Sequence, residues 1–201
     1  MTTRLSPRCV APLLALALLF TPLASSARAQ REHRDHLTAQ EIELVRDAQA
    51  LDARTTVFIK AAERRMQIIL GQAPAEAPKP AKKEKGDPLD KEVAAADWGA
   101  APKGTRAELL YDVAHILDEA IENIDDTAVH NPKSPLLHKS VRKLSDAASR
   151  FLAQLTPLRA NVTDDAEREQ LELAIENAQQ IVEAAKKLPA EEPDAKNGKK
   201  G

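Results

Sequence analysis

The feature that most constrains the fold of this chain is an amphipathic stretch running from Leu37 to Leu70. Thr38 and Glu41 have capping-box spacing, in which the side chain of each residue bonds the backbone N–H of the other. Mainly apolar residues then recur at steps of three and four, on one stripe of a helix: Leu44, Ala48, Leu51, Thr55, Phe58, Ala62, Met66 and Ile69. Gly71 follows where helices commonly end. We predict one continuous helix over residues 38–71, covered by another part of the protein because such a stripe is not stable alone in water.

The N-terminus has the three regions of a secretory signal peptide. Two early arginines supply the charged region, residues 10–20 the apolar region, and Ala-Arg-Ala at 27–29 the small-residue cleavage site. We predict that the signal peptide, residues 1–29, is cleaved after Ala29, which leaves a short tail over 30–37 and a secreted or periplasmic protein. The apolar region is too short for a stable anchor, and no later segment is apolar for long enough, so we expect no membrane span in the mature chain.

Cleavage at this site changes both the cysteine content and the charge. Cys9, the single cysteine, leaves with the signal peptide, so the stability of the mature chain must come from a hydrophobic core rather than from disulfides. Of the 29 lysines and arginines three also leave (Arg4, Arg8 and Arg28), and the remaining 26 against 31 acidic residues give a net charge of −5. This acidic balance disfavours nucleic acid as a partner.

A linker and a tail flank the second half of the chain. Residues 72–104 are rich in proline, alanine and lysine, which predicts a linker, with a possible short helix over 88–97. Trp98 is expected to pack on the helices as an apolar plug. The last residues, 189–201, have the composition of a disordered tail.

Between them, residues 105–188 have the pattern of three helices. A second capping box begins at Thr105, Asn131-Pro132 interrupts the pattern, and Thr163 opens the last helix. The middle helix has the heptad spacing of coiled-coil-like bundle packing and should end near Pro157: Leu137, Val141, Leu144, Ala148, Phe151, Leu155 and Leu158.

We therefore predict an all-α fold. The architecture is a four-helix bundle, made of a long first helix, a crossover linker and three sequential antiparallel helices joined by short loops. The alternative is a three-helix bundle over residues 105–188 whose first helix projects and pairs with a second copy. Both arrangements bury the same apolar stripes.

One polar face of the helix predicted to begin at Thr105 holds the main candidate metal ligands. Asp112, His115 and Glu119 have ligand spacing on a helix. Metal-binding bundles direct such side chains inward from several helices, whereas a helical wheel places His115 in the middle of the polar arc. We interpret this face as solvated and keep these three residues as weak candidates only. His33 and His36 in the tail are interpreted in the same way.

No other pattern indicates a reaction. The chain has no Ser-His-Asp or Cys-His set in a plausible arrangement, no glycine-rich phosphate loop after a strand, and no haem attachment motif. We assign no catalytic residue, metal or cofactor. The expected function is that of an exported, non-catalytic protein that acts in protein–protein interaction or as a structural or adaptor component, with a protein partner or self-association.

A short pattern at the start of the first helix supports one alternative. Residues 37–41, Leu-Thr-Ala-Gln-Glu, resemble the repeated LTxxQ motif of the small helical periplasmic stress chaperones. The resemblance covers about five residues, occurs once, and has Glu41 where that family has glutamine. It implies a chaperone-like protein as the alternative function. A weak metal-binding bundle is the further one.

Overall fold

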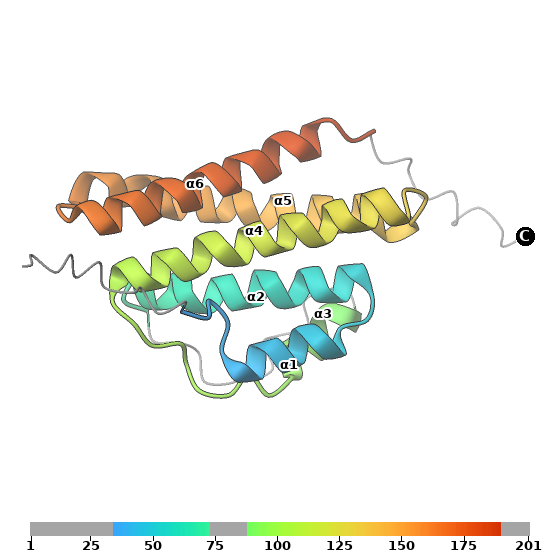
Figure 1. Cartoon of the computed structure of the whole chain (residues 1–201), viewed down its shortest axis with the longest axis horizontal. Coiled ribbons are helices and arrows are strands. Elements are labelled where there is room, and N and C mark those ends of the chain that lie inside the picture. The colour runs from blue at the N-terminus through green and yellow to red at the C-terminus, as the bar shows by residue number, and fades with distance from the viewer. Residues whose placement is uncertain (1–33, 73–87, 190–201) are drawn as a thin grey trace, which may run out of the picture. The chain divides into compact units, whose positions relative to one another are not determined.

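The computed structural model describes residues 34–72 and 88–189, and every regular element within these ranges is helical. In chain order the elements are α1 (Ala39–Asp47), α2 (Leu51–Ile69), α3 (Pro88–Ala95), α4 (Arg106–His130), α5 (Pro135–Leu155), the 3-10 helix η1 (Thr156–Asn161) and α6 (Asp165–Lys186) (Figure 1). The predicted all-α class is confirmed. The predicted signal peptide and residues 30–33 of the predicted tail lie outside the described residues.

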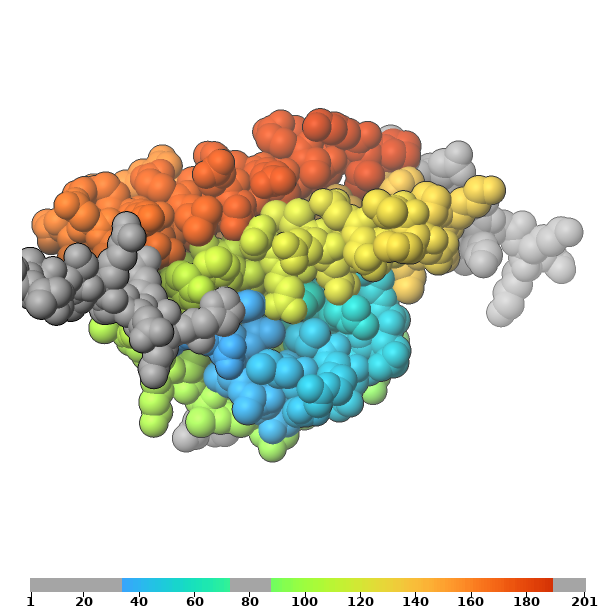
Figure 2. Space-filling view, in the orientation of Figure 1, coloured from blue at the N-terminus to red at the C-terminus, as the bar shows by residue number. Residues whose placement is uncertain are grey.

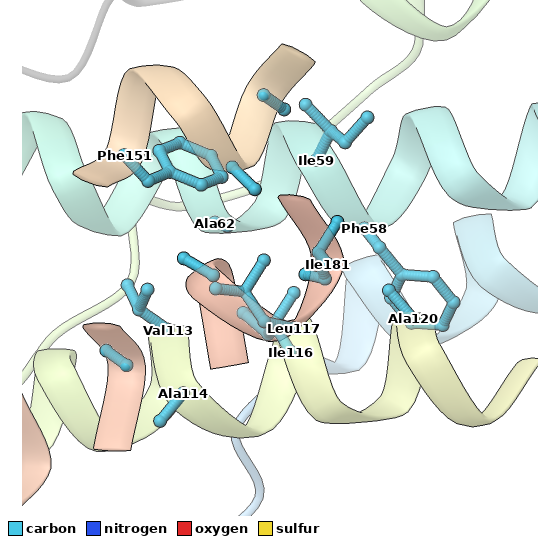
Figure 3. Packing of buried hydrophobic residues seen from close by; sticks show 14 of the residues in the cluster. Phe58, Ile59, Ala62, Val113, Ala114, Ile116, Leu117, Ala120, Phe151 and Ile181 are labelled. Atoms are coloured by element: carbon cyan, nitrogen blue, oxygen red, sulfur yellow. The ribbon is translucent and has the colours of Figure 1, made fainter. Parts of the chain in front are cut away.

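Four of the helices share one hydrophobic core. Helices α4 and α5 each contact both α2 and α6, and buried side chains of all four belong to a single cluster. Figure 3 shows side chains such as Phe58 of α2, Leu117 of α4 and Ile181 of α6 meeting in this core. Phe58 is only 1% exposed. Because α2 is buried within its own chain, the structure does not have the projecting first helix of the alternative arrangement.

Local sequence signals set most helix ends. At Thr38 and Thr105 the hydroxyl accepts the backbone N–H of the glutamate three residues on, and that glutamate accepts the backbone N–H of the threonine, so both predicted capping boxes are confirmed. Gly71 has a φ of 69° after α2, and its N–H and that of the next residue bond carbonyls of the last turn. Asp164, rather than Thr163 as predicted, caps α6 by accepting the N–H of Glu167.

The predicted single helix over 38–71 is wrong, because the chain breaks between α1 and α2 at residues 48–50. The ψ angle of Ala48 is 86°, which takes the backbone out of the helix. A straight helix would hold Glu41 and Arg65 about 36 Å apart at 1.5 Å per residue. Their side chains are instead ion-paired at 2.8 Å. The break folds α1 back against α2, and a tertiary contact thereby overrides a local helix pattern.

The short helix predicted within the linker is present as α3, which packs on α2. Trp98 after it is partly buried against the core, as predicted, and its Nε1 donates to the carbonyl of Val93 at 2.9 Å. The guanidinium carbon of Arg64 lies 5.6 Å from the centroid of the Trp98 rings. One guanidinium nitrogen of Arg64, Nη2, donates to the carbonyls of Gly99 and Ala100. The segment after α3 is thus held on α2.

The outer surface of these helices is mostly polar. Figure 2 shows α4 and α6 side by side on one face. The large hydrophobic side chains exposed among the described residues are Ile42 and Val129. None of the described helices combines the length and the apolar character needed to cross a membrane.

Candidate functional site

A buried ionic cluster, formed by Glu41, Arg65 and Asp112, joins α1, α2 and α4. The two terminal nitrogens of Arg65 donate to the two carboxylate oxygens of Glu41, each at 2.8 Å. Its Nε lies 3.5 Å from Oδ2 of Asp112. Arg65 also donates to the carbonyls of Ala61 and His36. All three members of the cluster are at most 1% exposed, so the cluster holds the N-terminal part of the fold by bidentate ion pairing away from water.

The environment of Glu41 lowers the pKa of its carboxyl group. Burial alone would raise this pKa, because it disfavours the charged form. The hydrogen bonds and positive charge of Arg65, the backbone N–H of Thr38 and the charge of Arg64 more than offset burial. The carboxylate is therefore ionised at neutral pH and pairs with Arg65 as an anion.

The structure gives the three candidate metal ligands different partners. The interpretation of their face as solvated is wrong for Asp112, which is buried against Arg65, because a charge on α2 faces it. His115 is half-buried, with its ring centroid 4.1 Å from that of Tyr111 and 5.8 Å from that of His36. Glu119 is bonded to Nε2 of His36 at 2.7 Å.

These contacts bring the end of the predicted tail onto α4. His36 pairs with Glu119, and Leu37 is buried in the core, so residues 36–37 belong to the folded part of the chain. Sequence spacing did not indicate that His36 approaches His115, since the two lie on separate elements. Within residues 34–72 and 88–189, no group of three or more His, Cys, Asp or Glu side chains is arranged to hold a metal ion. His33 lies outside the described residues.

A second polar feature is a groove of about 490 Å³ between α2, α3 and α5, called the charged groove below. Its lining contains five basic and three acidic side chains: Lys60, Lys139, Arg142, Lys143 and Arg150, with Glu63, Asp90 and Asp146. Ile59, Val93 and Ala94 add an apolar part. The lining therefore carries a net charge of +2 in a chain whose overall charge is −2.

Ion pairs within the charged groove hold its three helices together. Nζ of Lys143 lies 2.6 Å from Oδ1 of Asp90 on α3 and 2.9 Å from Oγ1 of Thr56 on α2. Lys60 and Arg150 share one carboxylate, that of Glu63. Because one anion serves two cations and the side chain of Arg150 is 56% exposed, this pairing is weak. A carboxylate of a ligand can take the place of Glu63 beside Arg150 without leaving a fully buried charge unpaired.

The basic side chains of the groove come mainly from one helix. Lys139, Arg142, Lys143 and Arg150 follow one another on α5 at steps of three, one and seven residues, which keeps them on one side of a helix. Along α5 these cations extend over about 16 Å, at 1.5 Å per residue. The spacing is visible in the sequence. The contribution of α3 to the opposite wall, Asp90, Val93 and Ala94, is not visible, because nothing in the sequence indicates where this short helix packs.

Comparison with the models of known protein families, with curated proteins and with solved structures finds no match for this chain. Its function is therefore inferred from its residues and their geometry.

Proposed function

We propose that this is an exported, non-catalytic interaction protein whose charged groove binds an acidic segment of a partner protein. Its scaffold is a four-helix bundle of α2, α4, α5 and α6, which the shared core of these helices supports. Export is supported by the charged, apolar and small-residue regions over 1–29. The observation that carries the binding proposal is the excess of positive charge in a concave site on an acidic chain.

The arrangement of the four α5 cations of the charged groove favours an acidic polypeptide over a small anion. A single phosphate is matched by two or three converging donors, whereas the cations of α5 are distributed along about 16 Å of helix. An extended peptide of about five residues covers that length. Its carboxylates can face successive cations, while Ile59 and Val93 offer apolar contact beneath it. Complementary charge of this kind contributes specificity and association rate more than affinity.

The binding test uses a fluorescein-labelled peptide of glutamates and fluorescence anisotropy at low ionic strength. We expect the mature protein to bind it, with an affinity that falls as salt is added. Arg142→Glu reverses one groove charge and should weaken binding by about 0.4–2 kcal/mol, taking about 0.2–1 kcal/mol for each exposed ion pair lost or made repulsive. That is about two- to thirtyfold in the dissociation constant.

The matched control is Arg46→Glu, which makes the same change of charge on α1, outside the groove. It should leave the affinity within twofold of the original. Equal weakening by both variants would mean that only the net charge matters, and would contradict a site in the groove. Full competition by inorganic phosphate at one equivalent would favour a small-anion site instead. The chaperone-like alternative predicts that unfolded chains bind regardless of their charge.

Intact mass of the exported protein tests the localisation. The proposal predicts mature material that begins at Gln30. Retention of residues 1–29 in the exported protein would contradict it.

A further inference from the structure

The described part of the chain ends beside the charged groove. Arg142, which lines the groove, donates a hydrogen bond to the carbonyl of Pro189, the last described residue. The five residues that follow, 190–194, are Ala-Glu-Glu-Pro-Asp, with three carboxylates before the first lysine at 196. The chain thus continues from the rim of a basic groove with an acidic segment that contains no basic residue.

The distances allow this segment to reach the groove. An extended chain advances about 3.3–3.6 Å per residue, so the backbones of Glu191 and Glu192 lie at most about 7–11 Å from Pro189. Lys139 and Lys143 are within one helical turn of Arg142, about 5 Å along the axis of α5. These lengths bring a glutamate at either position within reach of the amino groups of Lys139 and Lys143. The two amino groups already pair with Asp52 and Asp90, so the glutamate would share each cation with that carboxylate.

We propose that residues 190–194 bind the charged groove of their own chain and compete there with an acidic partner. This inference rests on the proposed function, because it uses the same groove and the same chemistry. A ligand tethered by so few residues has an effective concentration of the order of millimolar, so even a weak carboxylate contact would be substantially occupied. The partner then binds only the fraction of molecules whose groove is open.

The main test neutralises the segment in the full mature chain, with Glu191→Gln, Glu192→Gln and Asp194→Asn combined. Its affinity for the labelled glutamate peptide should rise about three- to tenfold, because the groove no longer has an internal competitor. The control combines Glu122→Gln, Asp125→Asn and Asp126→Asn, which remove the same charge from exposed positions of α4. It should change the affinity less than twofold.

Three outcomes separate this inference from the proposed function. If Arg142→Glu weakens peptide binding but the neutralised segment variant binds with the same affinity as the original protein, the proposed function holds and the internal competitor is overturned. A rise of equal size in the α4 control would reduce the effect to net charge and overturn it as well. Absence of peptide binding by every form would overturn both proposals.

A second measurement needs no added ligand. A carbodiimide joins a carboxylate to an amine in direct contact by forming an amide with loss of water. In dilute protein we expect links from Glu191 or Glu192 to Lys139 or Lys143 within one chain. Mass spectrometry of a mixture of isotopically light and heavy protein distinguishes links within a chain from links between copies. Links only between copies, or none to α5, would contradict self-docking.

Discussion

Replacing Arg65 by methionine should be among the most destabilising single changes in this protein. The guanidinium group of Arg65 is 1% exposed and is the shared partner of the Glu41 and Asp112 carboxylates. Methionine keeps much of the apolar stem but removes the charge and every hydrogen bond that the group donates. Two carboxylates then stay buried, with Arg64 the remaining cation beside Glu41.

The size of the effect follows from the burial of these ion pairs. Removing one partner of a buried ion pair typically destabilises by about 3–5 kcal/mol, because the remaining charge is left without compensation. For a chain of this length each kcal/mol lowers the melting temperature by about 2–4 °C, so a fall of about 6–20 °C is expected. Adding Glu41→Gln to the variant should cost less than the sum of the two single changes, with a coupling of about 0.5–3 kcal/mol.

Urea unfolding followed by circular dichroism measures these free energies. The control is Arg46→Met, since Arg46 is exposed and has one ion pair to Glu43 within α1. This control should stay within about 0.5 kcal/mol of the original protein. Two results would refute the buried ionic cluster as the contact that folds α1 back. One is an Arg65→Met variant as stable as the control, and the other is a double variant with Glu41→Gln whose loss of free energy equals the sum of the two single losses.

Three further predictions concern pH and the core. Because the pKa of Glu41 is lowered in the folded state, its contribution to stability should be complete above the unfolded pKa of about 4.5 and should be lost as pH falls through the lower folded value. Glu41→Gln should therefore reduce the loss of stability at acid pH, and an unchanged pH profile in this variant would contradict the pairing. Phe58→Ala should lower the free energy of unfolding by about 3–5 kcal/mol, whereas Ile42→Ala at the surface should lower it by less than about 1, and equal losses would place Phe58 outside the core. The hydroxyl of Ser140 is buried with no hydrogen-bond partner among the described residues, so Ser140→Ala should stabilise by about 1 kcal/mol relative to Ser149→Ala, and a loss of that size would reveal a partner.

Helix starts were predictable because their causes are local. Thr38 and Thr105 each have a glutamate three residues on, and both boxes form as the spacing predicts. The apolar steps of α5 likewise place Leu144, Phe151 and Leu155 in the core. In each case the residues that decide the structure are within one or two turns of one another.

The break between α1 and α2 was not predictable in this way. Residues 48–50, Ala-Gln-Ala, are good helix formers and contain neither glycine nor proline. What interrupts the helix is the pairing of Glu41 with Arg65, residues 24 positions apart. Asp112 is a similar case. The polar face of α4 suggests that its carboxylate is solvated, but in the structure the carboxylate is buried opposite Arg65 of α2. A buried charge is recognised only when its partner on another element is known.

The charged groove was partly visible. The basic positions of α5 have helical spacing in the sequence, but an exposed basic face has the same pattern. Their conversion into a groove depends on α3, whose Asp90 meets Lys143 across 53 positions of sequence. The acidic segment over 190–194 was visible in the composition of the tail. The sequence does not indicate that Pro189, the residue before it, contacts Arg142 of the groove; the structure shows this contact.

Chemical-shift mapping tests the binding of an acidic segment to the charged groove most directly. Isotopically labelled mature protein carrying the neutralised 190–194 segment is titrated with the glutamate peptide at low salt. Binding in the charged groove predicts saturable shifts concentrated on groove residues of α2, α3 and α5, among them Lys60, Asp90 and Arg142, with little change on α4 and α6. Shifts spread evenly over the exposed lysines and arginines, or centred on another face, would contradict it.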